Sequence, residues 1–453
     1  MIRRTLALVL ALVPGAAGAQ TLSRAEAVAQ ALANNPDVRK SQQELLLLRG
    51  KGREALADAL PEVKMYGTAL RYRDPSLLNS SSFDAFPPEL RSALRPIPAS
   101  LYEGIAQLNQ TLWSFKLGAG IRAAKLGVTL GEEQQKAVTR SIALVAIRAY
   151  NDYLLDVEKV KVAEKSVRQR EAHLEMAKNR RTAGVATDLD VLRLEVALEN
   201  QRALLERTRG ETEYARGALN AVMVRPIDAP VEPTDTLERQ DLEVPLAEAV
   251  ELAVANRAEV KVADLAVRVY DQLVSVEKAE RLPRLDLAAF WGYSVRQPKN
   301  FFSQDFTKWN AAVTLAVPIF DGFRAAGRIA QAQAQREQAA QDRIALENRI
   351  RLEAKDATDQ LATAGRVLRA ADLNVTQAQR ALDMTQANYT LGAATPLDVL
   401  DIQAALVLAE SLRLEALHAQ ANARATLRWV MGRDPLDGSA SVSNEAHTKA
   451  GSE

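Results

Sequence analysis

Four segments of this chain alternate between apolar and polar positions, the period-two pattern of a β-strand. They lie near residues 61–72, 101–113, 284–296 and 308–320. The first alternates poorly and is included only because an internal repeat places it beside the others. Each spans about 10 residues, enough for a tilted strand to cross the hydrocarbon layer of a membrane. We therefore expect one face of each strand to contact lipid and the other to contact water, with an ordinary half-buried soluble sheet as the alternative.

Aromatic residues border these segments. Bulky amphipathic rings collect at both membrane–water interfaces of outer-membrane barrels. We therefore expect a girdle role for Trp113, Trp291, Tyr293 and Trp309.

Between the strand pairs lie long proline-free stretches rich in Ala, Gln, Glu, Arg and Leu, at residues 117–181 and 324–389. A single helix over either stretch would be roughly 100 Å long at 1.5 Å per residue. The leading segment 23–56 and the returning segment 188–224 are each about half as long, so two of them stacked end to end match one long helix. This pattern favours the helical wall of a tube, against the alternative of a solvated structural coiled coil.

The chain is built twice. Ala25-Glu26-Ala27-Val28 recurs as Ala247-Glu248-Ala249-Val250, and the turn sequence at 184–192 returns at 392–400. We expect a first repeat at 20–225, a proline-rich linker at 226–245, a second repeat at 246–435 and a disordered polar tail at 436–453. Residues 1–19 read as a cleaved secretory signal peptide, with Arg3 and Arg4 before an apolar run and small residues after it.

Composition narrows the function. The 453 residues contain no cysteine, so neither a disulfide nor a lipid attached to a cysteine is available. The 58 basic and 57 acidic residues balance, which gives no signature of nucleic-acid binding. Apart from the signal, no apolar run approaches the 18 residues or so of a membrane-spanning helix.

Four strands cannot close a barrel, because open sheet edges are not tolerated in lipid and the smallest outer-membrane barrels have about eight strands. Several chains must therefore share one barrel. Two chains would give eight strands and three would give 12, and the residues alone do not decide between them.

Together the signal peptide, the duplicated order of elements and the Gly-x-x-Thr-x-x-Asp-Val-Leu turns resemble the TolC family of outer-membrane efflux proteins. The resemblance covers about residues 22–435. It implies a mixed α and β membrane protein: a homotrimer with a shared 12-stranded antiparallel transmembrane β-barrel and a long periplasmic α-helical barrel. It also implies an equatorial belt to which the linker contributes.

The resemblance further implies a passive duct in the outer membrane, extending into the periplasm and not lipidated, that serves an efflux or type I secretion system. Its partners would be a periplasmic adaptor and an inner-membrane pump of the resistance-nodulation type or an ABC exporter, with outer-membrane lipid around the barrel. No cofactor, metal or nucleic acid is expected. The cargo stays open.

Two helix–helix turns carry the candidate site residues. Gly184 and Gly392 lie where a helix C-terminus needs a positive φ, and Thr187 and Thr395 lie where a helix N-terminus needs a capping oxygen. Pro396 fits the first helical position.

Asp398 and Asp401 share a helix face at spacing i, i+3. By resemblance they would line the periplasmic constriction of the tunnel, where a trimer brings six carboxylates together. Crowded like charges raise pKa values and attract cations. The alternative is that capping and solvation explain both residues.

The resemblance also implies a link that closes the tip, a hydrogen bond between the carboxylate of Asp190 and the phenol of Tyr389. Ala394 stands where well-known family members carry an arginine. Because alanine cannot donate a charge-assisted bond, a second lock of that kind is absent and the closed tip is expected to be held more weakly.

Two other classes of function are consistent with fewer of these features. An enzyme is disfavoured because the three histidines are dispersed and no phosphate-binding glycine-rich loop is present. A periplasmic adaptor or coiled-coil interaction protein would share the export signal and the long helices. It would not need two copies of an amphipathic strand pair with aromatic borders.

Overall fold

The fold was analysed in a computed structural model, which describes residues 20–79, 85–93 and 97–436. The expected signal peptide at 1–19 and nearly all of the expected tail at 436–453 lie outside the described residues. The described chain divides into two compact units. One is helical and contains residues 20–43, 133–262 and 344–436, and the other contains the main sheet with residues 44–132 and 263–343.

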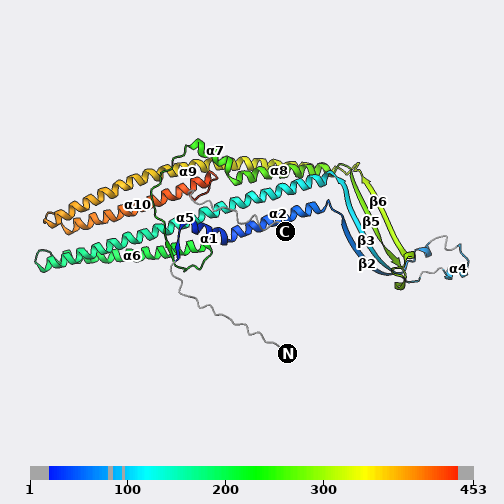
Figure 1. Ribbon diagram of the computed structural model, residues 1–453, viewed down its shortest axis with the longest axis horizontal. Coiled ribbons are helices and arrows are strands. Elements are labelled where there is room, and N and C mark those ends of the chain that lie inside the picture. The colour runs from blue at the N-terminus through cyan, green and yellow to red at the C-terminus, as the bar shows by residue number, and fades with distance from the viewer. Residues whose placement is uncertain (1–19, 80–84, 94–96, 437–453) are drawn as a thin grey trace, which may run out of the picture. The chain divides into compact units, whose positions relative to one another are not determined.

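The helical unit is made mainly of helices that run antiparallel in pairs (Figure 1). The long helix α5 (Phe115–Thr182) is followed by α6 (Asp188–Met223), and α9 (Arg324–Thr390) is followed by α10 (Pro396–Val430). Helices α5 and α9, of 68 and 67 residues, also contribute residues to the other unit. The long proline-free stretches of the sequence therefore form single helices, as the composition predicts.

The expected leading helix is interrupted in both halves. In the first half α1 (Arg24–Asn34) and α2 (Pro36–Ala57) meet at Asn35, which adopts an extended conformation with ψ 129°. The reason is Pro36, which lacks an N–H and disfavours the helical conformation in the residue before it. In the second half α7 (Leu246–Asn256) and α8 (Ala258–Ala279) meet at Arg257, ψ 131°, where no proline is present.

The core of the helical unit lies where a short parallel sheet, β1 (Gln20–Leu22) with β4 (Val231–Pro233), packs beside α5. Two buried tyrosines of α5 fasten it: the Tyr150 hydroxyl donates to the Leu22 carbonyl at 2.9 Å, and the Tyr153 hydroxyl donates to the Val231 carbonyl at 2.6 Å. The Leu22 carbonyl also accepts from the Thr234 backbone N–H at 3.1 Å, so the two bonds chiefly give the buried tyrosine hydroxyls their acceptors. The expected linker is thereby tied to the helices.

The other unit holds a four-stranded antiparallel sheet in the order β2-β3-β5-β6 (Figure 1). Its strands are β2 (Glu62–Tyr72), β3 (Ala99–Ser114), β5 (Arg284–Val295) and β6 (Thr307–Ala316). Short helical turns accompany the loops between strands: η1 (Ser76–Asn79), α4 (Pro88–Ala93), η2 (Pro298–Asn300) and η3 (Gln304–Phe306).

Two details of the sheet differ from the sequence pattern. The last strand ends at Ala316 and not near residue 320, because Pro318 cannot donate to a strand ladder. A β-bulge between Thr111 and Trp113 shifts the register of β3, so that Trp113, and not Leu112, lies opposite Leu285.

In the described part of the chain, no helix is long and apolar enough to cross a membrane.

Candidate functional site

The first helix–helix turn joins α5 to α6. Gly184 has φ +77°, a conformation that glycine adopts at little cost. Thr187 is the N-cap of α6: its hydroxyl oxygen accepts from the Asp190 backbone N–H at 3.2 Å. In return, one carboxylate oxygen of Asp190 accepts from the Thr187 backbone N–H at 3.0 Å and from its hydroxyl at 2.7 Å. This reciprocal capping box fixes where α6 begins.

The second turn joins α9 to α10 and repeats this geometry. Gly392 again has φ +77°, Thr395 is the N-cap, and Pro396 occupies the first helical position. The carboxylate of Asp398 accepts from the Thr395 backbone N–H and from its hydroxyl, both at 2.7 Å. In both turns, therefore, bonds between residues three positions apart define the start of the second helix.

Asp398 and Asp401 are both exposed on α10, one turn apart. The hydrogen bonds from the backbone and side chain of Thr395 hold the pKa of the Asp398 carboxyl below its usual value. Within one chain the capping effect is therefore opposite to the raised pKa that crowding of several carboxylates would produce. The crowding effect requires other copies of the chain around the same axis.

The structure does not bring Asp190 and Tyr389 into a hydrogen bond within one chain. The Asp190 carboxylate is engaged by Thr187, and Tyr389 is buried, with 8% of its surface exposed. The guanidinium of Arg180, at the end of α5, lies 4.6 Å from the centre of the Tyr389 ring and donates to the Tyr389 carbonyl at 3.5 Å. A cation–π contact thus joins the two helix pairs near their turns.

The sequence pattern did not indicate Arg180, because the family resemblance points to position 394, where this chain has Ala394. The contact joins residues 209 positions apart. An arginine near a helix C-terminus reads as a favourable charge for that end of the helix, and no local pattern points to its aromatic partner.

A small pocket lies between the helix pairs, beside the buried Tyr389. Its lining includes His173 from α5 and Gln403 from α10. Burial lowers the pKa of His173, and the charge of Arg170 lowers it further. Gln403 is 4% exposed, and neither its side-chain oxygen nor its nitrogen has a hydrogen-bond partner among the described residues. The packing between the two pairs is therefore polar here as well as apolar.

The sheet has two chemically distinct faces. Directly opposite residues of β5 and β6 point to the same side, and on one side they are Leu285 with Leu315, Leu287 with Val313, Ala289 with Ala311 and Trp291 with Trp309. Many of these side chains are exposed, Trp309 at 73% and Leu315 at 62%. An exposed and continuous apolar face of this kind marks a contact with lipid or with another protein.

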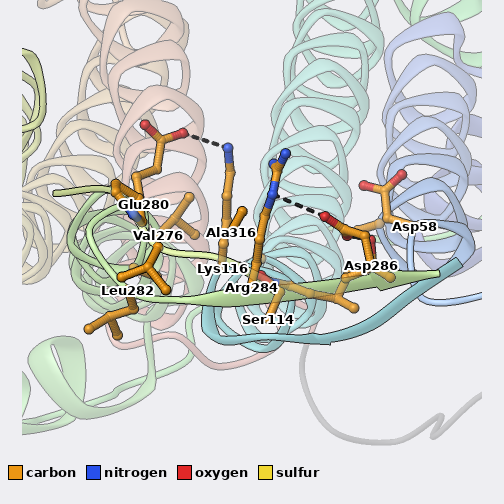
Figure 2. Close-up of a pocket in the computed structure, with 16 residues that line it drawn as sticks. Asp58, Ser114, Lys116, Val276, Glu280, Leu282, Arg284, Asp286 and Ala316 are labelled. Carbon is orange, nitrogen blue, oxygen red and sulfur yellow. Dashed lines mark hydrogen bonds and ion pairs between the residues drawn. The ribbon is translucent and has the colours of Figure 1, made fainter. Parts of the chain in front are cut away.

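The other face is polar and carries paired charges. Glu103 accepts from the Ser294 hydroxyl at 2.9 Å, and Asp286 accepts from the Thr111 hydroxyl at 3.1 Å. At the helix end of the sheet lies a pocket of about 740 Å³ (Figure 2). In it Lys116 pairs with Glu280 at 2.6 Å and Arg284 pairs with Asp286 at 3.1 Å. These groups suit contact with water.

The predicted aromatic residues lie toward the two ends of the sheet. Trp113 lies opposite Leu285 at the helix end, where its ring contacts Phe115 at 4.5 Å. Trp291 and Tyr293 lie toward the other end, where Tyr293 packs against Phe302 with ring centres 5.6 Å apart. Eight residues separate positions 285 and 293 of β5, or roughly 26 Å along the strand, close to the height of an outer-membrane apolar band.

Close backbone packing connects the strands at this distal end. A Cβ atom on Gly292 would lie 2.0 Å from the carbonyl oxygen of Gly104 in the neighbouring strand. Glycine at this position therefore permits an approach that no side chain allows.

Among the described residues, no group of three or more His, Cys, Asp or Glu side chains is arranged to hold a metal ion.

Comparisons with known proteins identify the family of the chain. The chain matches the family described as "Outer membrane efflux protein" over residues 27–223 and 249–433. It is 27% identical over 391 residues to the outer membrane protein OprJ of Pseudomonas aeruginosa, which covers 84% of this chain and 78% of OprJ. It is 23% identical over 342 residues to the alkaline protease secretion protein AprF of the same species, covering 73% of this chain and 69% of AprF.

Solved structures share the fold. The outer membrane protein VceC of Vibrio cholerae superposes with a TM-score of 0.77 at 18% identity, covering 91% of this chain and 97% of VceC. A membrane protein from Pseudomonas aeruginosa superposes with a TM-score of 0.78 at 23% identity, covering 90% of this chain and 92% of that protein. With its long helix pairs, its two-faced sheet and the family match over most of its length, the chain belongs to the outer membrane efflux protein family and is an outer-membrane efflux component, not an enzyme.

Proposed function

We propose that this protein is the outer-membrane channel of a tripartite efflux or type I secretion system, formed by three identical chains. The observation that carries the proposal is the four-stranded sheet, in a chain of the outer membrane efflux family, with one exposed apolar face and two open edges. The family match favours this function over the alternative of a periplasmic adaptor.

The open edges support a barrel shared between chains. Strands β2 and β6 form the two edges of the sheet, and among the described residues no further strand pairs with the outer side of either. In lipid the backbone groups of such an edge must find partners, which the edge of a neighbouring copy supplies. Three copies give a 12-stranded barrel, with the two repeats of each chain contributing two strands each.

The natural absence of cysteine makes the oligomer directly testable. Each test variant carries two cysteines, one replacing Met65 in β2 and one replacing Ala311, Val313 or Leu315 in β6. The variants are oxidised in the membrane. The proposal expects one or more combinations to give a covalent trimer on a denaturing gel. A covalent ladder that stops at the dimer in every combination would contradict three copies.

Within this channel, Asp398 and Asp401 line the periplasmic constriction. Support comes from their exposure, and from a turn geometry that aims the start of α10 in a fixed direction. Three copies bring six carboxylates around one axis, which would attract cations and favour their passage over that of anions.

The constriction is tested by the Asp398→Asn/Asp401→Asn double variant in planar bilayers. Its matched control is Asp356→Asn/Asp359→Asn, an exposed pair at the same spacing on α9. We expect the first variant to lose cation selectivity and block by multivalent cations, and the control to keep both. If the two variants show equal cation selectivity and equal block, Asp398 and Asp401 do not line the constriction.

The closed state is held at the turns. A bond between Asp190 and Tyr389 would need Asp190 to give up or share its capping bonds, whereas the Arg180 contact with Tyr389 is formed within each chain. We therefore add Arg180 to the residues proposed to hold the tip closed. Its contact partly replaces the one that other family members make with an arginine at the position of Ala394. The proposed partners are a periplasmic adaptor and an inner-membrane pump, the second of which supplies the energy.

The cargo is not fixed by this argument, because a wide lumen has no shaped pocket. Two relatives, each 23% identical to this chain, are named for different cargoes, one for protease secretion and one for pyoverdine export.

A further inference from the structure

The apolar face of the sheet does not stop where the last strand ends. Trp309, Val313 and Leu315 lie on that face of β6, and Val317 and Ile319 continue the same alternation beyond it. These side chains are largely exposed, Leu315 at 62%, Val317 at 52% and Ile319 at 96%. The turn between β6 and α9 thus extends the exposed apolar face toward the helices.

Two phenylalanines enlarge this turn. Phe320 and Phe323 are 75% and 76% exposed, and their rings meet edge to face with centres 5.6 Å apart. Phe323 has φ +64°, a left-handed conformation that costs energy for a bulky residue. Aromatic rings at such a position are typical of the boundary between hydrocarbon and water.

Basic side chains surround the same turn. A pocket of about 480 Å³ is lined by the apolar residues Ile319, Phe320 and Phe323 and by the charged residues Glu280, Asp321, Arg281, Arg324 and Arg328.

The acidic groups of this pocket are already engaged. Glu280 accepts from Lys116 and from Arg328, each at 2.6 Å, and these bonds hold the pKa of its carboxyl below the usual value. Asp321 accepts from the Ala325 backbone N–H at 2.7 Å and so caps α9.

Two guanidinium groups remain. Arg281 and Arg324 are exposed, and neither side chain has a hydrogen bond or ion pair within the described part of the chain. The pocket therefore combines unengaged positive charge with an exposed apolar wall. This combination is complementary to a molecule with an anionic head and an apolar tail.

We propose that this pocket binds an anionic phospholipid of the inner leaflet of the outer membrane. Arg281 and Arg324 contact the phosphate group, and the acyl chains lie against Ile319, Phe320 and Phe323. The inference rests on the proposed function, which places the helices in the periplasm and hence this end of the sheet at the inner leaflet. Guanidinium groups suit phosphate because they donate two parallel hydrogen bonds.

The test uses the full-length protein purified in detergent and native mass spectrometry. Phosphatidylglycerol and phosphatidylcholine with identical acyl chains are titrated separately, and inorganic phosphate is added as a competitor. The site variant is Arg281→Gln/Arg324→Gln. The control is Arg296→Gln/Lys299→Gln, which removes the same charge at the other end of the same strands.

The wild-type protein should bind phosphatidylglycerol in preference to phosphatidylcholine. The site variant should lose roughly 25-fold in that affinity, about fivefold for each basic residue near an anionic lipid surface. The control should keep it. Equal binding of the two lipids, an equal loss in the control, or displacement of the lipid by an equimolar amount of inorganic phosphate would each overturn the proposal.

A second copy of the chain is the other possible occupant of this surface. The Phe320→Ser/Phe323→Ser variant separates the two, because a lipid site predicts an intact oligomer with weaker lipid binding, whereas dissociation of the oligomer overturns the lipid site. Conductance is measured on the same wild-type preparation. If the protein conducts ions but shows no lipid preference, only the lipid site is contradicted. If inserted protein conducts no ions, the proposed channel function itself is contradicted.

Discussion

A buried arginine in the helical unit offers the sharpest test of how that unit is held together. Arg257 lies between α7 and α8, and its side chain is only 6% exposed. It pairs with Glu259 at 3.0 Å and with Glu353 of α9, and its guanidinium lies 4.4 Å from the centre of the Trp429 ring of α10. One side chain therefore joins three helical segments.

The perturbation is Arg257→Met, which keeps much of the apolar stem and removes the charge. Removing one partner of a fully buried pair costs about 3–5 kcal/mol. The side chains of Glu259 and Glu353 are 32% and 36% exposed, so water partly replaces the lost partner. We therefore expect a loss of about 2–3 kcal/mol in the local stability of this region, which includes the lost cation–π contact.

Hydrogen exchange measured by mass spectrometry reports this local stability. Amides of α7 and of the start of α8 should exchange roughly 30- to 150-fold faster in the variant, since each 1.4 kcal/mol is tenfold. The control is Lys355→Met on α9, which breaks an exposed pair with Asp359 and should leave exchange unchanged. A change below about threefold for Arg257→Met, or an equal change in the control, would refute this assignment.

The ion pair between Arg257 and Glu259 should make the stability of this region depend on pH. Burial raises the pKa of Glu259, but the hydrogen bonds and charge of Arg257 outweigh it and leave the pKa lowered. A carboxyl with a lowered pKa contributes stability above its unfolded value of 4.5 and loses it as the pH falls through the folded value. In Arg257→Met the bonds and charge of Arg257 are lost while the burial of Glu259 remains, so the difference in stability between wild type and variant should be largest at neutral pH and shrink toward pH 4. A difference that grows on acidification would contradict this.

Three further predictions concern the turns and the sheet. Thr395→Val removes the hydroxyl that caps α10, so the pKa of Asp398 should rise toward its ordinary value and the first turn of the helix should exchange faster, as measured by NMR titration and hydrogen exchange. Gly292→Ala would collide with the neighbouring strand, and we expect loss of folded protein in the membrane fraction. Arg180→Gln removes the contact with Tyr389, and more frequent opening in bilayers and increased antibiotic leak are expected than for Tyr389→Phe, whose ring keeps that contact.

The features predicted best from the sequence are those set by neighbours along the chain. The two turns follow from capping, because Thr187 and Thr395 bond to residues only three positions away. Three of the four strands follow from alternation, which needs no knowledge of the partner strand, and β2 follows from the internal repeat. The break at Asn35 was not predicted, although the proline that follows it is a local signal for it.

The features that were missed depend on residues far apart in the sequence. The break at Arg257 has no proline, and its arginine is held by Glu353, 96 positions away. The Arg180 contact with Tyr389 crosses between the two helix pairs, and the bulge near Trp113 is visible only once β3 is paired with β5. Periodicity indicates which face of an element is apolar, but it does not say which distant charge meets which ring.

The proposed roles of the turn residues depend on the oligomer, because a constriction forms only when several copies of the chain come together. Asp398 within one chain is a capping residue with a lowered pKa. It becomes part of a cation-binding ring only when other copies bring their own carboxylates close to it.

The most direct test of the channel is the single-channel conductance of the purified wild-type protein in planar bilayers, with and without multivalent cations on the periplasmic side. The account predicts small, cation-selective steps that such cations block from that side. Protein shown to be folded and inserted that conducts no ions under any condition would contradict the account.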